Sequence, residues 1–358
     1  MATTAATPRR PRRLCRSDLG APGYARRRCG KGFVYRDEAG ERITDAEVIG
    51  RITSLVIPPA WKDVWISRDP FGHIQATGTD AAGRKQYRYH DHWRERRDRE
   101  KFDSMIDFAR SLPRLRRTAS RDLARGDLSR ERVLGGATRL LDRGFFRIGS
   151  EGYAEDNETY GLATIRKDHV TVRPDAVVFD YDAKGGQRRV QQLADPELLD
   201  LLGTLRRRRS GGPELLAYKQ GRTWRDVRSQ DINDYVKEAA DGDFSAKDFR
   251  TWNATVLAAI GLAVSGEMAA ASKTARKRAA RRAVDEVARY LGNTPAVCRA
   301  SYIDPRVFDR FDGGLTIGGV LPDLATDLDD WTMQRSVEEG VLDLIAGDEG
   351  SEAVERVA

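Results

Sequence analysis

The chain has 358 residues, of which 40% are hydrophobic and 33% are charged, and it carries a formal net charge of +7 with a pI of about 9.3. This composition is typical of a globular protein with a large solvated surface, and the length suffices for two domains with separate cores. The most apolar run, residues 256–264, is far too short for a membrane span, and no apolar stretch follows the N-terminal arginines, so we expect neither a membrane protein nor a secretory signal.

Charge is distributed unevenly along the sequence. Residues 1–29 contain eight arginines and one acidic residue, Asp18, whereas residues 321–358 contain eleven acidic residues and two arginines, a balance of −9. Removing that acidic segment from the total of +7 leaves +16 on the rest of the chain. Such a strong positive charge on the remaining residues predicts a polyanionic partner, and nucleic acid is the leading candidate.

The cysteines and histidines follow no metal-ligand pattern. Cys15, Cys29 and Cys298 form no CxxC pair, and the four histidines form no HxxxH set. Scattered cysteines indicate a reducing compartment, so we expect a cytoplasmic protein with no structural zinc site.

The N-terminal third begins as an arm and continues as strands and then a helix. Residues 1–20 are rich in Arg, Ala, Thr and Pro and are expected to be a disordered basic arm. From residue 21 to about 92, short runs of alternating apolar and polar residues are separated by turn formers, which predicts strands. From residue 93 the apolar spacing becomes helical. The residues on that helical face are Phe102, Met105, Ile106 and Ala109.

The second region is predicted to be mainly helical, with one small antiparallel sheet. Residues 159–172 and 175–193 alternate in the manner of strands, and the sequence AKGG at 183–186 predicts a tight turn between two of them. Helices are expected from about residue 195 to about residue 312.

A short helix is predicted just before Tyr302. The preceding helix, RRAVDEVARYLG (281–292), has a single apolar face and ends at Gly292. Thr294 is a suitable N-cap and Pro295 suits the first helical position. Tyr302 is therefore expected to lie on a helix whose start is fixed by these residues.

A tyrosine held near arginines could attack a DNA phosphodiester. The phenol, with a pKa of about 10, must lose its proton as it attacks. Fixed donors must meet the negative charge that gathers on the non-bridging oxygens, and the departing 5′ oxygen needs a proton from a general acid. Guanidinium groups suit the phosphate because each binds two oxygens. Two arginines, a lysine and one further donor would meet these demands without a metal.

Four stretches, in this order, resemble the active-site segments of type IB DNA topoisomerases of the compact poxvirus and bacterial kind. They are GFFRIGSEGYAEDNETYGLATIRKDHV (144–170), FDYDAKGGQRR (179–189), FSAKDFRTWNA (244–254) and LGNTPAVCRASYI (291–303). The resemblance covers about residues 22–315, which is nearly all of the chain except its two tails.

The resemblance implies a role for five residues. Arg147 and Arg250 match the catalytic arginines, Lys184 matches the general acid, and Tyr302 matches the nucleophile, which forms a 3′-phosphotyrosyl bond. Asn293 matches the donor to the transition state, where many relatives have histidine. Because an amide is neutral and charge-assisted hydrogen bonds are stronger, we expect reduced but not abolished stabilisation.

A fifth stretch, GRKQYRYH (83–90), resembles the family's major-groove contact segment. The residues that it would place near DNA are Arg84, Lys85, Gln86, Tyr87 and Tyr89.

The expected architecture is α+β, with a small β-rich N-terminal domain and a larger, mainly α-helical catalytic domain that contains a small antiparallel sheet. We expect a basic arm at 1–20, a DNA-clamping domain at 21–95, a catalytic domain at 96–315 and an acidic tail at 316–358 that is weakly packed or disordered. The enzyme is expected to be a monomer that relaxes supercoiled double-stranded DNA at the nucleoid in the cytoplasm. No metal, nucleotide or other cofactor is expected.

Two other classes of protein remain open from the residues alone. A tyrosine recombinase would use the same groups, although it typically has His-x-x-Arg at the second arginine, where this chain has Lys247 before Arg250. In a non-catalytic DNA-binding protein, Tyr302 would be structural and the basic stretch 273–282 would contact phosphates.

Two further alternatives concern single positions. Asp180 and Asp182 share one face of a predicted strand and could hold magnesium for a metal-dependent cleavage. Lys167, one strand earlier, is a rival of Lys184 for the role of general acid.

Overall fold

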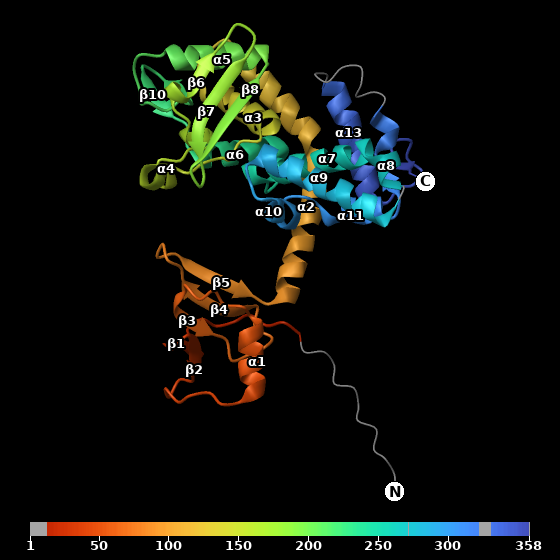
Figure 1. The fold of residues 1–358 in the computed structure, drawn as a ribbon. Coiled ribbons are helices and arrows are strands. Elements are labelled where there is room, and N and C mark those ends of the chain that lie inside the picture. Colours follow the sequence, from red (N-terminus) through yellow and green to blue (C-terminus); the bar gives the residue numbers. More distant parts are fainter. Residues whose placement is uncertain (1–12, 271, 322–330, 358) are drawn as a thin grey trace. The chain divides into compact units, whose positions relative to one another are not determined.

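The computed structural model describes residues 13–270, 272–321 and 331–357 and divides the chain into two compact units, Met1–Lys101 and Phe102–Ala358 (Figure 1). The division falls within helix α2 (Asp91–Leu123). The first unit is built on a five-stranded sheet and the second is mainly helical, which confirms the predicted α+β class.

The N-terminal unit is an antiparallel sheet with one helix on one of its faces. The strand order is β2-β1-β3-β4-β5. Its strands are β1 (Tyr24–Cys29), β2 (Gly32–Arg36), β3 (Lys62–Ile66), β4 (Ile74–Thr79) and β5 (Lys85–Tyr89). Ile52 of helix α1 (Ala46–Ser54) joins Val64, Ile66 and Ala76 in a small core.

Helix α1 was not predicted from the sequence. Its N-cap is Asp45, whose carboxylate accepts hydrogen bonds from the backbone N–H groups of Glu47 and Val48. An aspartate followed by an acidic first turn is a local helix start, but the surrounding strand-like runs obscured it.

The structure describes only part of the segment that was expected to be a disordered arm. Residues 1–12 lie outside the described residues. Cys15 forms a β-bridge to Gly72, the Ser17 N–H donates to His73 Nδ1 at 2.8 Å, and the Ser17 hydroxyl donates to the Ile74 carbonyl at 2.9 Å. Residues 13–20 are therefore attached to the sheet and are not part of a disordered arm.

The second unit contains most of the described helices, and its described strands form three small sheets. Its helices after α2 are α3 (Arg130–Gly144), α4 (Glu151–Asn157), α5 (Pro196–Arg207), α6 (Ser229–Ala240), α7 (Ala246–Val264), α8 (Gly266–Ala270), α9 (Lys273–Leu291), α10 (Pro295–Ser301), α11 (Pro305–Asp312) and α13 (Trp331–Ala346). The strands β6 (Val170–Val172), β7 (Val177–Ala183) and β8 (Gln187–Leu193) form an antiparallel sheet on which α5 packs (Figure 1). As predicted, a tight turn at residues 184–186 joins β7 to β8.

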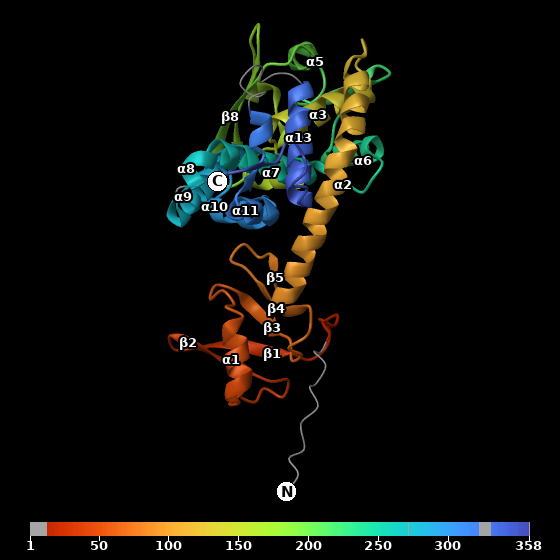
Figure 2. The same cartoon turned by 90° about the vertical axis from the view of Figure 1, so that its right-hand side faces the viewer.

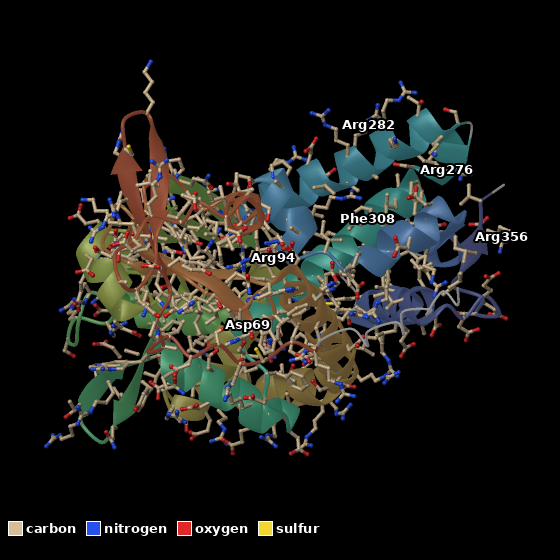
Figure 3. All side chains as sticks on the ribbon, turned by 90° about the horizontal axis from the view of Figure 1, so that it is seen from below. Asp69, Arg94, Arg276, Arg282, Phe308 and Arg356 are labelled. Carbon is tan, nitrogen blue, oxygen red and sulfur yellow. The ribbon has the colours of Figure 1, made fainter. Side chains whose placement is uncertain are left out.

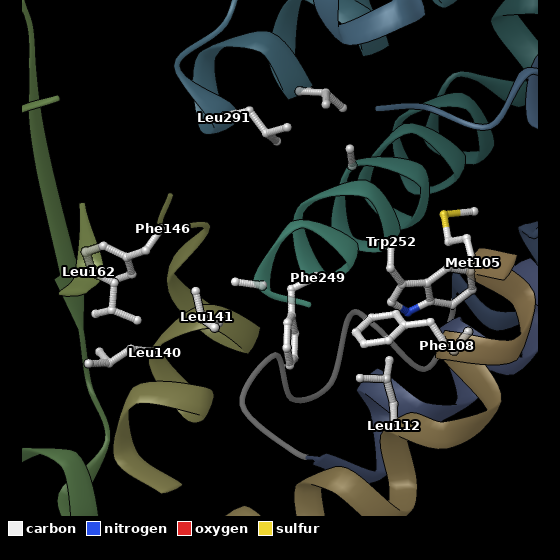
Figure 4. Close-up of a cluster of buried hydrophobic side chains, with 14 of the residues drawn as sticks. Met105, Phe108, Leu112, Leu140, Leu141, Phe146, Leu162, Phe249, Trp252 and Leu291 are labelled. Atoms are coloured by element: carbon white, nitrogen blue, oxygen red, sulfur yellow. The ribbon is translucent and has the colours of Figure 1, made fainter. Parts of the chain in front are cut away.

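Helix α7 lies at the centre of the large core. Phe249 and Trp252 on α7 are fully buried and face Phe108 and Met105 of α2, with the Phe108 and Phe249 ring centroids 5.0 Å apart (Figure 4). The predicted apolar face of α2 is confirmed, because Phe102, Met105 and Ala109 are buried and Ile106 packs against the core. The first turn of α7 is thereby fixed firmly within the second unit.

A β-hairpin interrupts the region that was predicted to be helical throughout. Strands β9 (Ala217–Gln220) and β10 (Thr223–Asp226) form it. The buried guanidinium of Arg208 donates to the Leu215 carbonyl at 2.6 Å and so fixes the approach to the hairpin. The contact spans only seven residues, but no sequence motif marks it.

The acidic C-terminal segment contributes to the core, contrary to the expectation of weak packing. Val337, Val341 and Leu344 of α13 are buried, and β12 (Glu355–Arg356) pairs with β11 (Leu315–Thr316). Glu338 shares the Arg116 guanidinium of α2 with a second carboxylate, that of Asp142. Burial opposes the charge of Arg116, but these two carboxylates raise its pKa. Figure 2 shows α13 beside the C-terminal half of α2.

None of the helices within the described residues combines the length and hydrophobicity that crossing a membrane requires.

Candidate active site

One pocket of about 330 Å³ in the second unit brings together side chains from distant parts of the sequence. Its lining residues are Arg147, Ile148, Gly149, Ser150, Thr159, Tyr160, Lys184, Ala246, Lys247, Arg250 and Tyr302. Four of the five residues that were predicted to be catalytic therefore line the same pocket. The fifth, Asn293, contacts Arg147 directly.

Arg250 is the fifth residue of α7 and is only 4% exposed. Asp248 accepts hydrogen bonds from the backbone and hydroxyl of Ser245 and so fixes the helix start. The Arg250 guanidinium donates to the carbonyls of Phe145 and Leu291, and its Cζ lies 5.4 Å from the centroid of the Tyr302 ring. Its Nε is buried without a hydrogen-bond partner among the described residues.

Electrostatics at Arg250 also favour an anionic ligand. Burial, assisted by the positive charge of Arg147, lowers the pKa of Arg250 to about 10, while Tyr302 acts in the opposite direction. The guanidinium is still charged at neutral pH, but it has lost much of its hydration. A phosphate in the pocket would restore the lost favourable interactions of this cation.

Arg147 and Asn293 form a second donor pair. Arg147 follows Phe145, which adopts a left-handed conformation (φ 54°) at the end of α3. Its Nη2 donates to the Gly292 carbonyl at 2.9 Å and to Asn293 Oδ1. Because Oδ1 accepts from Arg147, the amide presents Nδ2 elsewhere, and Nδ2 is buried without a hydrogen-bond partner in the described part of the chain.

The thiol of Cys298 lies near the Asn293 amide and interacts with it. The pKa of Cys298 is raised, chiefly by burial, while Arg250 and the Asn293 amide act in the opposite direction. A thiol is at most a weak acceptor, so the Nδ2 group of Asn293 still lacks a strong hydrogen-bond acceptor. An unsatisfied buried N–H₂ beside two arginines is suited to a phosphate oxygen.

Tyr302 follows the predicted short helix α10 directly. The side chain of Thr294 accepts from the Val297 N–H and Pro295 occupies the first position, as the sequence predicted. Tyr302 is the C-cap of this helix, with its N–H bonded to the Cys298 carbonyl at 2.9 Å. Its half-buried ring faces the pocket from this fixed backbone.

Thr255 of α7 holds the chain on the other side of Tyr302. Its Oγ1 accepts from the Asp304 N–H at 3.1 Å and lies 3.4 Å from the Tyr302 carbonyl oxygen. Arg250 is five residues earlier on the same helix. One rigid helix therefore holds both a guanidinium and the backbone of the tyrosine.

Lys184 reaches the pocket from the turn between β7 and β8. Gly185 and Gly186 have φ values of 84° and 68°, which favour glycine, and the Gly186 N–H closes the turn on the Ala183 carbonyl at 3.0 Å. The rival Lys167 lies in a short 3₁₀ turn (Lys167–His169) and does not line this pocket. The geometry therefore favours Lys184 over Lys167.

Asp180, one of the two aspartates considered for magnesium, pairs with an arginine. Asp180 accepts two hydrogen bonds from Arg188, at 2.8 and 2.6 Å, and these lower the pKa of its carboxyl group. Within the described residues, no group of three or more His, Cys, Asp or Glu side chains is arranged to hold a metal ion. Asp180 is thus engaged in an ion pair on the hairpin surface.

In the N-terminal unit, the predicted DNA-contact segment divides between the two faces of β5. Lys85, Tyr87 and Tyr89 alternate on one face; the two tyrosines are 40% and 39% exposed, with ring centroids 6.1 Å apart. This is the face without α1. Gln86 points to the other face and, like Arg84, is hydrogen-bonded to Asp80. Lys85, Tyr87 and Tyr89 are the better placed for an external partner.

Seven of the eleven residues that line the pocket were not among the predicted site residues, and two of these have polar groups that bear on a ligand. Thr159 has a buried hydroxyl without a hydrogen-bond partner in the described residues, and Lys247 stands in the first turn of α7 beside the pocket. Lys247 was noted in the sequence only as the replacement for a histidine. No local pattern singles out Thr159 within its segment.

Comparison with known proteins gives matches along most of the chain. A model described as "Bacterial DNA topoisomerase IB, N-terminal domain" matches residues 32–80, and one described as "Eukaryotic DNA topoisomerase I, catalytic core" matches residues 90–311. The chain is 33% identical over 291 residues to DNA topoisomerase 1B of Acanthamoeba polyphaga mimivirus, covering 78% of this chain and 85% of the relative. It is 28% identical over 160 residues to DNA topoisomerase 1 of Schizosaccharomyces pombe, covering 44% of this chain and 19% of the relative. The second model spans every residue of the pocket.

Proposed function

Since the chain belongs to the type IB DNA topoisomerases, isomerases that act on DNA, we propose that it relaxes supercoiled DNA by transient cleavage of one strand through a 3′-phosphotyrosyl bond to Tyr302. The observation that supports this mechanism is the shared pocket of Arg147, Lys184, Arg250 and Tyr302. No single pair of these residues would carry the proposal, since isolated arginines and tyrosines are common.

In the cleavage step, Tyr302 Oη attacks the phosphorus and its proton passes to solvent. The new bond joins this oxygen to phosphorus while the bond from phosphorus to the 5′ oxygen breaks. Arg147, Arg250 and the Nδ2 of Asn293 would donate to the non-bridging oxygens, where negative charge increases. Fixed donors in a pocket with little water stabilise that charge without reorganising during the reaction.

Lys184 would act as the general acid that protonates the departing 5′ oxygen. The free end then rotates under torsional strain, and the 5′ hydroxyl attacks the phosphotyrosine to restore the strand. Because the phosphotyrosine conserves the energy of the broken bond, the cycle needs neither ATP nor a metal ion. We also propose that the protein acts as a monomer on DNA at the nucleoid.

The N-terminal unit would contribute to holding the duplex. Lys85 supplies charge, and Tyr87 and Tyr89 supply flat, exposed rings on one face of β5. We therefore assign DNA clamping to residues 21–95 and catalysis to residues 96–315. The recombinase alternative is less well supported because Lys247 occupies the place where a histidine is typical.

The proposed function is tested by relaxation of a supercoiled plasmid in excess EDTA without ATP. Relaxation is expected to proceed at an unchanged rate, because no step uses a metal ion or a nucleotide. A plasmid that stays supercoiled in EDTA and relaxes when magnesium is restored would contradict the proposal and revive a role for Asp180 and Asp182.

Replacing the general acid gives a second expected result. Lys184→Ala should slow cleavage of ordinary DNA on the order of 100-fold, a typical contribution of general acid catalysis. On a duplex whose leaving 5′ oxygen is replaced by sulfur, the variant should cleave about as fast as the wild type, because a thiolate leaves without protonation. Single-turnover cleavage of the two duplexes is the measurement. Equal slowing on both would show that Lys184 has another role.

A further inference from the structure

The C-terminal end of α9 is bound by three arginines from three other parts of the chain. Arg189 of β8 donates to the carbonyls of Arg289, at 3.0 Å, and Tyr290. Arg250 donates to the Leu291 carbonyl at 2.9 Å, and Arg147 donates to the Gly292 carbonyl at 2.9 Å. The last three carbonyls of the helix and that of its cap thus each accept from a guanidinium.

This arrangement has a clear physical basis. The last carbonyls of a helix lack intrahelical partners and carry the negative end of the helix dipole. They therefore accept from some of the donors of the three guanidinium groups and offset part of the repulsion among these groups. Two of the three, Arg147 and Arg250, belong to the proposed phosphate-binding set, whereas Arg189 does not.

Arg189 comes from the hairpin that carries Lys184. It lies on β8 five residues after Lys184, opposite Tyr181 in the register of the two strands. Burial lowers the pKa of Arg189, with Arg147 acting in the same direction. Gly292 (φ 62°) leaves space for this side chain, because a Cβ there would lie 3.1 Å from Arg189 Nη1. The guanidinium is therefore packed between β8 and the helix end.

We propose that Arg189 is a positioning residue that holds the Lys184 hairpin against the helix end on which the phosphate-binding arginines are assembled. The inference rests on the proposed function, since it assigns Arg189 an effect through the general acid. Arg147, Arg250 and Asn293 retain their own contacts when Arg189 is removed. The hairpin, by contrast, loses its two hydrogen bonds to α9, so Lys184 is the group whose placement suffers.

A matched control lies one residue away. Arg188 is also on β8, but it is exposed and its guanidinium is bound to Asp180 on the same hairpin. Replacing Arg188 removes the same charge from the same strand without touching α9. Any effect of general charge reduction should therefore appear equally in both variants.

The test is single-turnover cleavage of a duplex with a mapped cleavage site, prepared with oxygen or with sulfur at the leaving 5′ position. Arg189→Ala should cleave the oxygen duplex about 10-fold to 100-fold more slowly, because a small misplacement of a reacting group has effects of this size. On the sulfur duplex it should be within about twofold of the wild type, since sulfur needs no general acid. Arg188→Ala should match the wild type on both.

Two further variants separate positioning from loss of structure. Lys184→Ala/Arg189→Ala should be no slower than Lys184→Ala alone, because both changes remove the same function. Arg189→Lys, which retains a donor, should recover part of the rate. Wild-type speed in Arg189→Ala, or equal slowing on both duplexes, would overturn the inference while the proposed function stands. A wild-type protein that cleaves neither duplex would instead refute the proposed function.

Discussion

Tyr302→Phe is expected to eliminate relaxation and covalent capture of DNA while leaving DNA binding intact. The variant keeps the ring that lies beside Arg250 and loses only the oxygen that would attack phosphorus. Since the variant has no nucleophilic oxygen at this position, the rate should fall below detection. The measurements are plasmid relaxation, recovery of a protein–DNA adduct after denaturation, and duplex affinity.

Tyr290→Phe is the matched control for this experiment. Tyr290 is on α9 close to the site, but its ring is 46% exposed and packs beside Phe145, with centroids 5.8 Å apart. Removing its hydroxyl should leave relaxation and the adduct unchanged. An adduct that persists in Tyr302→Phe would refute the assignment of the nucleophile.

Arg250→Ala is expected to slow cleavage by about 1,000-fold, at the upper end of the effect of removing one fixed donor to a transition state. The side chain is nearly fully buried, and its Nε has no hydrogen-bond partner among the described residues. Water therefore cannot easily replace the guanidinium as a donor to the phosphate. Single-turnover cleavage measures this loss. DNA affinity should change much less, because many other cations contact the backbone of a duplex.

The thermal stability of Arg250→Ala decides how that loss is interpreted. The substitution removes hydrogen bonds to Phe145 and Leu291, a cost of about 1–3 kcal/mol for each carbonyl left unsatisfied, but it also removes a desolvated charge. The folded population should therefore remain large at assay temperature. Arg335→Ala, at an exposed site on α13 paired with Glu339, serves as the arginine control. A rate within tenfold of wild type would contradict a role for Arg250 at the phosphate.

The features that could be predicted from sequence depend on neighbouring residues. Gly292 ends α9 in a left-handed conformation, and Thr294 and Pro295 start α10, because capping is decided within a few residues. The Lys184 turn was equally predictable, since two glycines meet its backbone requirements. Such local rules predicted the short helix before Tyr302, although Tyr302 was expected on the helix and is its C-cap.

The features that could not be predicted depend on contacts between distant residues. Glu338 of the acidic tail is buried because Arg116 lies opposite it, more than two hundred residues earlier.

The basic stretch of α9 was considered in the sequence as a possible phosphate-contacting surface. Figure 3 shows Arg276 and Arg282 extending from that helix. The Arg276 guanidinium donates to the Asp312 carbonyl.

The orientation of the Asn293 side chain also could not be predicted from the sequence. Asn293 was expected to be a weaker donor than histidine, but the direction of its amide could not be known. Arg147 binds the amide oxygen, and this contact orients the nitrogen as a donor. A neutral side chain is thereby given a fixed orientation by a charged neighbour, which is a property of the pair.

The attachment of α7 to the chain around Tyr302 has a mechanical consequence. During strand rotation the enzyme would be tethered to DNA through one tyrosine, so every pull on the DNA would reach its backbone. The Asp304 N–H donates to Thr255, and this hydrogen bond would connect the tethered backbone to a nineteen-residue helix that is buried in the core. Five residues of helix separate Thr255 from Arg250, about 7.5 Å along the axis, and a hydrogen-bonded rod of that length stretches very little. A load on the tether would thus reach the same buried helix that carries Arg250.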